Sequence, residues 1–383
     1  MNVSYSYFQK TLLSVIVCAL MLALAAAPAK AQLQIKTEDI TVKFGFQGQF
    51  WADYTQDATA PSAGNQGYAQ NFYLLRDRLM LGGTIGDNIS FFFQTDDPKL
   101  GLSPNGSTAT KTLTTGNTTS PGFLIQDAWA AYKVNTHLEL SGGEMLVPVS
   151  RQSLASTLSY YTVNISSVST VNNTALVESA LRDVGFQARG YFFNDRFQYR
   201  GGIFDGYRTP DGRNAPRPAL YLQYDFFDRE KEYAYAGTAL GKRKILALDI
   251  GGDKQGTYRS DSLNVTNDTP VRGGDEVGFN FNVMHFDGRN YFTSIPDQTN
   301  YLIEGAYLFH KIKTQPFAKF ETQDFTAAVN GTKDINRWGT GLNYYIHGQN
   351  LKWTAQYTRA LPQNGSTIRP SNEFTMQLQV FYY

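Results

Sequence analysis

The sequence predicts an all-β protein: a transmembrane antiparallel β-barrel of about 16 strands, with short turns at one end and long loops at the other. Three observations predict it. The last stretch, residues 372–383, alternates apolar and polar residues and ends on two tyrosines, as the wall of such a barrel requires. Similar segments recur along the chain, joined by short and long connections in turn. Beyond residue 31, no stretch has the uncharged apolar run of about 18 residues that a membrane helix needs.

The first residues predict export. A single early cation, Lys10, precedes an uncharged apolar run over residues 12–27, and Ala29-Lys30-Ala31 follows. This is the pattern of a secretory signal with a small-x-small cleavage site. Residues 1–31 are therefore expected to be a signal peptide, and residues 32–383 the mature protein.

The composition of the mature chain excludes several classes of protein. The only cysteine, Cys18, lies in the signal, so disulfides and thiol chemistry are excluded. Loss of Lys10 and Lys30 reduces the 34 basic residues to 32, against 33 acidic ones, for a net charge of −1. That balance predicts neither a nucleic-acid binder nor a polybasic membrane-surface protein. Aromatic residues make up 14% of the chain, which suits a barrel whose alternate residues meet lipid.

The first strand is expected over residues 41–54. Its apolar parity consists of Val42, Phe44, Phe46, Phe50, Ala52 and Tyr54, and its polar parity of Lys43, Gln47, Gln49 and Asp53. We expect residues 372–383 to pair with it and to close the barrel. The second strand, 72–83, is expected to place Tyr73, Leu75, Leu79 and Leu81 outward and Arg76 and Arg78 inward, because a lipid-facing arginine at mid-membrane costs a few kcal/mol.

Sixteen segments in all have strand character. They are 42–54, 72–83, 89–95, 123–134, 137–146, 183–193, 196–205, 217–227, 245–254, 258–266, 277–286, 300–309, 315–324, 337–346, 351–359 and 373–383. Segment 258–266 has the weakest support, only Leu263 and Val265, and without it the even strand number that such barrels require would be lost. A barrel of this size is wide enough for a water-filled channel, so one domain accounts for residues 32–383.

A long connection, residues 147–182, has a composition that suits the inside of the barrel. It is rich in Ser, Thr, Asn and Val, and its charged residues are Arg151, Glu178 and Arg182. Folded into the lumen, it would form a constriction lined by hydroxyl groups and a few charges. The alternative is a solvated outer loop.

Several segments, in the same order along the chain, resemble the phosphate-selective porin O/P family (OprO/OprP-like). Residues 123–133 followed by 143–152 look like its paired signature, and 72–82 is similar to its arginine-containing second strand. Residues 182–187, 202–206, 235–245 and the C-terminal stretch complete the set. The resemblance covers the mature chain. It implies a 16-stranded, homotrimeric porin in the lipid of the Gram-negative outer membrane, with its third loop folded into the lumen.

The sequence departs from that family at positions that bear on selectivity. Glu144 and Leu146 stand where many members carry a glutamine and a lysine. The rows of inward arginines and lysines of the phosphate-specific members cannot be mapped here.

A porin selects solutes by electrostatics, because the charged side chains of its lumen replace part of a solute's hydration. Strand parity and loop position give the anion-selecting cations Arg76, Arg78, Lys133, Arg151, Arg189 and Arg200. The opposing lumen acids are Asp53, Asp127, Asp183 and Glu321. Arg76 and Arg78 are two apart on one face, so both guanidiniums can point at one anionic group. The alternative to a role in selectivity is that each of these residues forms an ion pair along the wall and fixes the shape of the barrel.

Motifs of enzymes and metal sites are missing from the sequence. H-E-x-x-H and G-x-S-x-G do not occur, and the four histidines are scattered. Residues 237–242 resemble a phosphate-binding loop, but the glycine spacing is one short and Arg243 replaces the hydroxyl residue, so a turn is expected. No catalytic residue, metal or cofactor is predicted.

The sequence therefore predicts a porin for the passive diffusion of small hydrophilic solutes, in particular anions such as phosphate. Within this class, the alternative is a non-selective or cation-preferring pore. Two alternatives belong to other classes: an outer-membrane enzyme barrel, and a secreted all-β binding or adhesion protein, which would be extracted without detergent.

Overall fold

The structure, a computed structural model, describes residues 33–102, 123–171, 181–207, 215–327, 334–363, 366 and 368–383. The chain divides into two units, residues 1–33 and 34–383, and the strands given below lie in the second. The predicted signal peptide lies outside the described residues, as does Glu178. Within the described ranges, no helix is long and apolar enough to cross a membrane.

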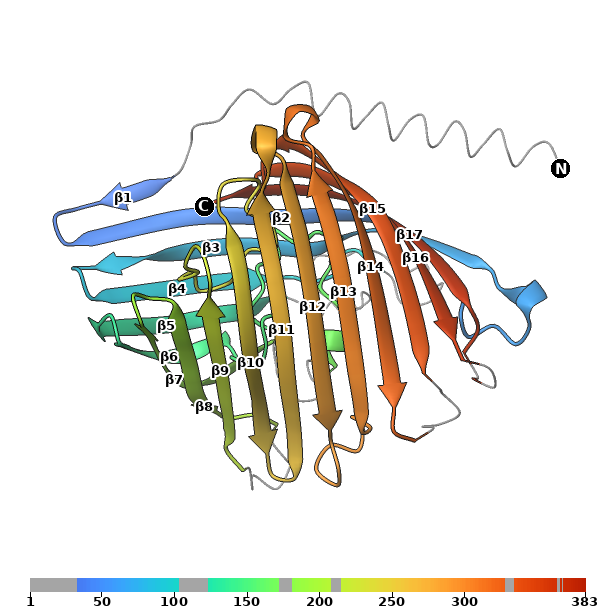
Figure 1. The fold of residues 1–383 in the computed structure, drawn as a ribbon, viewed down its shortest axis with the longest axis horizontal. Helices are drawn as coiled ribbons and strands as arrows, with labels where there is room; N and C mark the ends of the chain where they lie inside the picture. The colour runs from blue at the N-terminus through green and yellow to red at the C-terminus, as the bar shows by residue number, and fades with distance from the viewer. Residues whose placement is uncertain are drawn as a thin grey trace. The chain divides into compact units, whose positions relative to one another are not determined.

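Sixteen antiparallel strands form a closed ring (Figure 1). They are β2 (Ile40–Gln56), β3 (Tyr68–Ile85), β4 (Ile89–Asp96), β5 (Leu124–Asn135), β6 (Leu138–Leu146), β7 (Arg182–Phe192), β8 (Phe197–Phe204), β9 (Arg217–Asp225), β10 (Ile245–Gln255), β11 (Tyr258–Pro270), β12 (Glu276–Asp287), β13 (Gln298–Leu308), β14 (Thr314–Phe325), β15 (Ile335–His347), β16 (Leu351–Pro362) and β17 (Ser371–Tyr382). Each pairs with the next, and β17 pairs with β2 to close the ring. The predicted barrel of about 16 strands is confirmed, and its weakest segment is strand β11.

A few short elements accompany the ring. Strand β1 (Gln34–Lys36) pairs with residues 41–43 of β2. The short 3-10 helices are η1 (Ala63–Asn65), η2 (Val168–Thr170), η3 (Arg272–Gly274) and η4 (His310–Ile312).

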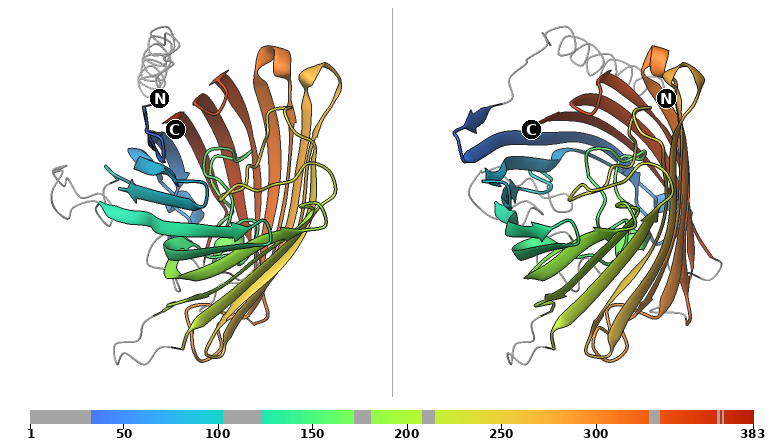
Figure 2. Two further views of the ribbon diagram at one scale, coloured as in Figure 1. Left: turned by 90° about the vertical axis from the view of Figure 1, so that its left-hand side faces the viewer. Right: turned by 60° about the vertical axis from the view of Figure 1, so that its left-hand side comes forward.

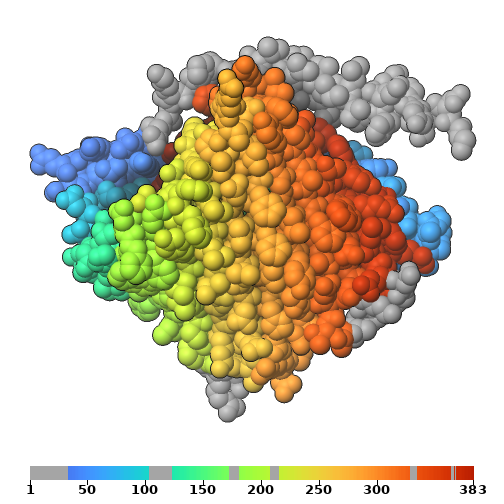
Figure 3. All heavy atoms as spheres, in the orientation of Figure 1, coloured from blue at the N-terminus to red at the C-terminus, as the bar shows by residue number. Residues whose placement is uncertain are grey.

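The two faces of the wall differ in polarity, as the alternation predicts. On β17, Phe374 and Tyr382 are more than 40% exposed, whereas Gln377 and Gln379 are almost fully buried inside the barrel. Across the closing seam, Gln49 Nε2 donates to Gln379 Oε1 at 2.8 Å and Trp51 Nε1 donates to Gln377 Oε1 at 2.7 Å. The space-filling view shows the outer face of β10–β15 as one continuous surface (Figure 3).

The predicted orientation of the second strand is wrong in its first half. The register shifts between Gln49 and Phe50 of β2: Gln49 lies opposite Arg76 but Phe50 lies opposite Leu74, so Leu75 is an extra residue on β3. A bulge of this kind resets the alternation of side chains. Arg76 and Arg78 face inward as predicted, but Tyr73 and Leu75 are also buried, where they pack against Val163.

The two ends of the barrel differ in their connections. At the short-turn end lie the start of β2, the end of β17 and tight connections such as 86–88, 136–137 and 193–196. At the long-loop end lie the connections 57–67 and 288–297 and the described residues that follow β4 (97–102) and β6 (147–171), although β10 and β11 are joined there by a tight turn at Gly256. The asymmetry is also broken at the other end, where residues 226–244, between β9 and β10, form a long segment among the short turns.

Gly143 on β6 gives a direct test of the backbone geometry of the wall. Its φ is +127°, and a Cβ there would overlap the carbonyl oxygen of Ala128 on the neighbouring strand. Strain of this kind costs about 1–3 kcal/mol, so Gly143→Ala is expected to lower the yield of folded barrel. The yield is measured as the fraction that migrates anomalously in an unheated gel.

The matched control for that substitution is Gly201→Ala on β8. There an added Cβ would meet only ordinary contacts, the nearest being Leu220 Cδ1 at 3.5 Å. The control is expected to fold like the wild type, and equal folded yields for both variants would contradict this account of Gly143.

Candidate functional site in the barrel lumen

Residues 147–171, here called the inner loop, lie against the inner faces of strands from all around the barrel (Figure 2). Its hydrogen-bond partners on the wall include Gln47 of β2, Ser262 of β11, Asn300 of β13, Asn343 of β15 and Gln356 of β16, at 2.7–3.0 Å. The inner loop therefore crosses the lumen and contacts opposite walls.

The inner loop can leave the wall because its own side chains satisfy its turns. The Ser153 hydroxyl donates to the carbonyl oxygen of Ser150 at 2.7 Å, with that of Val147 also within reach at 3.1 Å, and it accepts from the Ser150 amide at 2.9 Å. Short hydroxyl side chains commonly bond to nearby backbone in this way and replace the partners that a strand would supply. The abundance of Ser and Thr noted in the sequence thus has a structural use.

Residues 226–244, here called the strap, enter the lumen from the short-turn end and meet the inner loop. The Tyr235 amide donates to Leu154 O at 2.8 Å, and the Ser156 amide donates to Tyr235 O at 2.7 Å. On one side, Tyr233 Oη donates to Asp127 of β5 at 2.7 Å. On the other, Thr238 and Ala239 donate to Glu276 of β12 and Asp268 of β11. The strap therefore reaches across the barrel from β5 to β12.

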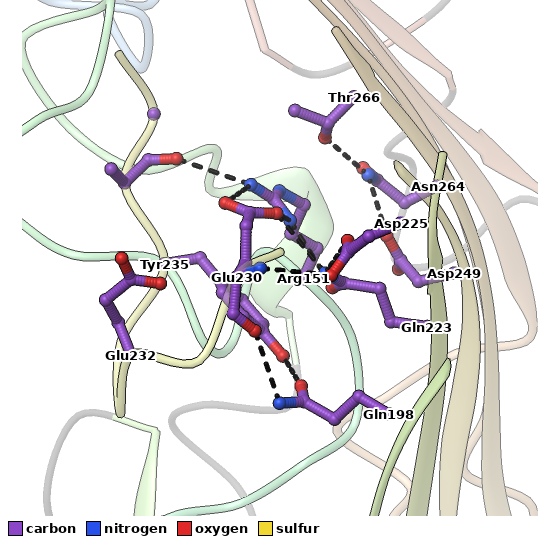
Figure 4. A network of polar contacts seen from close by, with 12 residues as sticks. Arg151, Gln198, Gln223, Asp225, Glu230, Glu232, Tyr235, Asp249, Asn264 and Thr266 are labelled. Carbon is purple, nitrogen blue, oxygen red and sulfur yellow. Dashed lines mark hydrogen bonds and ion pairs between the residues drawn. The ribbon is translucent and has the colours of Figure 1, made fainter. Parts of the chain in front are cut away.

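A buried ion pair joins the inner loop to the strap (Figure 4). Arg151 Nη1 and Nη2 bond to the two carboxylate oxygens of Glu230 at 2.6 and 2.8 Å. Glu230 is fully buried and Arg151 nearly so. Burial by itself would lower the pKa of Arg151, but the Glu230 carboxylate outweighs that effect and holds this pKa well above its usual value. The two-bonded geometry is the strong form of such a pair.

Tyr235 lies between two arginines beside this pair. The guanidinium carbon of Arg151 is 4.8 Å from the centre of the Tyr235 ring, and that of Arg200 is 4.6 Å away. Arg200 also donates to the carbonyl oxygens of Tyr233 and Glu232 at 2.7 Å. Arg151 and Arg200, both predicted to select anions, thus hold the strap in place.

Arg76 and Arg78 lie on the same inward face of β3 but have different partners. Arg76 donates to Gln49 Oε1 at 2.6 Å and to Asn164 Oδ1 of the inner loop at 2.8 Å. Arg78 bonds to Asp96 at 2.8 Å and to Thr157 of the inner loop at 3.2 Å. Among the residues that the structure describes, no carboxylate forms an ion pair with Arg76, so its charge has only neutral amide partners.

Inward charges are unevenly distributed around the lumen, although Asp96, Asp127 and Asp183 lie among the arginines and Lys319 and Lys352 lie on or near the acidic strands. Inward arginines come from β3, β7, β8 and β9: Arg76, Arg78, Arg182, Arg200 and Arg217. Inward acids come from β10 to β14: Asp249, Asp268, Glu276, Glu304 and Glu321. A lumen with separated charges carries a field across the path of a solute.

Comparison with known proteins supports the predicted resemblance. A sequence model of the family described as phosphate-selective porin O and P matches this chain. The match covers residues 44–181. The resemblance is therefore confirmed over the strands and the inner loop that carry Arg76, Arg78 and Arg151. No curated protein matches the chain.

Solved outer-membrane proteins, an anion-selective porin among them, have the same fold. The chain is similar to an anion-selective porin from Comamonas acidovorans, with a TM-score of 0.57 and 12% identity over 90% of this chain and 100% of that one. It is similar to OprB of Pseudomonas putida, with a TM-score of 0.60 and 8% identity over 88% and 94%. It is also similar to OmpT of Vibrio cholerae, solved in its trimer form, with a TM-score of 0.56 and 13% identity over 90% and 100%. At these identities the likeness concerns the porin fold.

Several of the other predicted residues form pairs along the wall. Asp127 pairs with Arg182 at 3.1 Å, Asp183 with Arg217 at 3.2 Å, Arg189 with Glu139 at 2.7 Å and Glu321 with Lys319 at 3.2 Å. Asp53 accepts a hydrogen bond from Asn71 at 2.8 Å. Lys133 is exposed near the short-turn end of β5. These pairs match the alternative given for the predicted residues, in which charged side chains pair along the wall and fix the shape of the barrel.

Sequence reasoning missed the strap. The predicted turn at 237–242 is present, with the Lys242 amide donating to Ala239 O at 3.2 Å, but the passage of residues 226–244 through the lumen was not predicted. The available signal was length, because this connection is far longer than the others at its end of the barrel. Within the described ranges, no group of three or more His, Cys, Asp or Glu side chains could hold a metal ion.

The contact between the inner loop and the strap can be tested by Glu230→Gln. This change leaves the buried Arg151 without a counter-charge, which costs about 3–5 kcal/mol. In the detergent-folded protein, hydrogen exchange of the amides of Ser156 and Tyr235 is expected to accelerate by at least about tenfold.

The control breaks a partly exposed arginine–glutamate pair on the wall, between β6 and β7. Glu139→Gln removes the acid that pairs with Arg189 on the wall, and it should leave exchange of those two amides unchanged. Wild-type exchange rates in Glu230→Gln would show that the pair does not hold the two segments together.

Proposed function

We propose that this chain is a porin of the Gram-negative outer membrane through which small hydrophilic solutes, above all anions such as phosphate, diffuse passively. The observation that carries the proposal is the position of Arg76. Its guanidinium lies between the barrel wall and the inner loop, and its bonds there go to neutral amide oxygens. An arginine keeps its charge under all ordinary conditions, so this part of the lumen is positive.

The inner loop is proposed to be the constriction. It contacts β2, β11, β13, β15 and β16 from inside, so a solute must pass beside it. Its charged residue in the described part, Arg151, is neutralised by Glu230. We therefore expect that solutes are selected by the charge of Arg76, which lies on the wall beside the inner loop.

Anion preference is proposed over the cation-preferring alternative from the charges beside the inner loop. Among the acids on the other side, Asp268 and Glu276 are held by hydrogen bonds from the strap, and Glu321 is paired with Lys319. On the arginine side, Asp96 offsets Arg78 and Asp127 offsets Arg182, which leaves the charge of Arg76 in excess. The lumen near the inner loop is therefore expected to attract anions.

Localisation and assembly follow from the same proposal. The porin fold, the predicted signal peptide and the apolar outer face support a place in outer-membrane lipid. A homotrimer is proposed because the similar OmpT of Vibrio cholerae is described in a trimer form. A channel needs no covalent step, and we propose no enzymatic activity.

Arg76→Gln tests the anion filter. Removal of one charge beside the path removes roughly 0.5–1 kcal/mol of attraction in a water-like dielectric, so the ratio of anion to cation permeability should fall about two- to fivefold. The ratio is measured as the reversal potential of the purified porin in a planar bilayer under a KCl gradient.

Lys311→Gln is the control, since it removes one positive charge from an exposed position on η4. Its reversal potential should equal that of the wild type. An unchanged reversal potential in Arg76→Gln would remove Arg76 from the filter.

A further inference from the structure

A cavity of about 760 Å³ lies within the barrel toward the short-turn end. One side is formed by the inner loop at residues 155–158 and by the strap at residues 232–234, and the other by strands β2 to β5. The side chains that matter for its chemistry are Lys43, Arg78, Phe92, Trp129, Tyr233 and Tyr383. The cavity therefore combines cations with an unusual number of aromatic rings.

The strand register aligns several of these residues in one row. Lys43 of β2 lies opposite Gly82 of β3, Gly82 opposite Phe92 of β4, and Phe92 opposite Trp129 of β5. Neighbouring strands are about 4.8 Å apart, so the row leads within a few strands from an ammonium group to two aromatic rings. A ligand with one charged end and one flat apolar end would fit along it.

The rings form one cluster on the inner side of the wall. The centres of Phe92 and Trp129 are 6.1 Å apart, those of Trp129 and Tyr233 4.9 Å apart, and those of Phe92 and Tyr383 5.9 Å apart in a perpendicular arrangement. Gly82 makes room for this cluster, because a Cβ there would overlap the Tyr383 hydroxyl and contact the Phe92 ring. Aromatic rings prefer offset-stacked or edge-on partners at such separations.

The polar groups of the cavity suit an anion. Within the part of the chain that the structure describes, Lys43 forms no ion pair. Arg182 also lines the cavity, and the one carboxylate among its lining residues, Glu232, pairs with Arg243. Arg78 lies deeper along β3, toward the inner loop.

We propose that this cavity binds a planar aromatic carboxylate on its way through the porin, with the carboxylate at Lys43 and the ring against Phe92, Trp129 and Tyr233. The inference rests on the proposed function, which it extends from anions in general to one class of anion. A carboxylate supplies the negative charge that Lys43 attracts, and an aromatic body covers rings that a small inorganic anion would leave in contact with water.

The test compares three carboxylates of equal charge on the wild-type porin in a planar bilayer. Benzoate, cyclohexanecarboxylate and acetate are each added during chloride conduction, and the concentration that halves the conductance is measured. Benzoate should act at a concentration about tenfold lower than acetate, and lower than cyclohexanecarboxylate, because only benzoate can stack on the rings.

Variants locate the site. Trp129→Leu should abolish the preference for benzoate over acetate. Trp338→Leu, the same change on the lipid-facing side of β15, where the side chain is exposed, should keep it. If Trp129→Leu does not fold, as judged from its migration in an unheated gel, Tyr233→Leu serves in its place.

The outcomes separate this inference from the proposed function. Absent chloride conductance, or conductance without anion preference, would overturn the proposed function and this inference with it. Anion-preferring conductance with equal inhibition by all three carboxylates would overturn this inference alone. Equal potency of benzoate and cyclohexanecarboxylate would overturn the claim that the ligand must be aromatic. A benzoate preference that survives in both Trp129→Leu and Tyr233→Leu would overturn the assigned cavity.

Discussion

Closure of the sheet between β17 and β2 is the constraint on which the rest of this molecule depends. In a bilayer, unpaired backbone groups cost several kcal/mol each, so a sheet that crosses it must close on itself. Here the seam pairs residues 373–382 with residues 46–55, and glutamine side chains on the inner side bond across it. Once the ring is closed, its outer face can be apolar, and its inner face is free to hold polar side chains and further segments of the chain.

The interior of this porin fold is organised by two such segments that hold each other. The inner loop enters from the long-loop end and the strap from the short-turn end, and the Arg151–Glu230 pair and the bonds at Tyr235 join them. Most inward arginines are engaged with acids or with the strap, whereas Arg76 bonds to neutral amides beside the inner loop. The proposed selectivity thus depends on whether each charged side chain has a partner of opposite charge, and less on the number of charged side chains in the lumen.

The sequence predicts the wall better than the interior, for a physical reason. Alternation follows from lipid on one side of each strand and water on the other, so it is local and can be recognised even in the weak strand β11. It fails at Leu75, where one extra residue resets the alternation and turns Tyr73 and Leu75 toward the inner loop. The strap was missed because its contacts with Asp127, Arg151 and Glu276 join residues far apart in the chain, which no local pattern reveals.

The measurement that tests the central claim most directly is the reversal potential of the purified wild-type porin in a planar bilayer under a KCl gradient. An uncompensated guanidinium beside the inner loop predicts stepwise conductance with a reversal potential displaced toward that of chloride. Conductance with a reversal potential displaced toward that of potassium would contradict the account, because the acidic side of the lumen would then control the path.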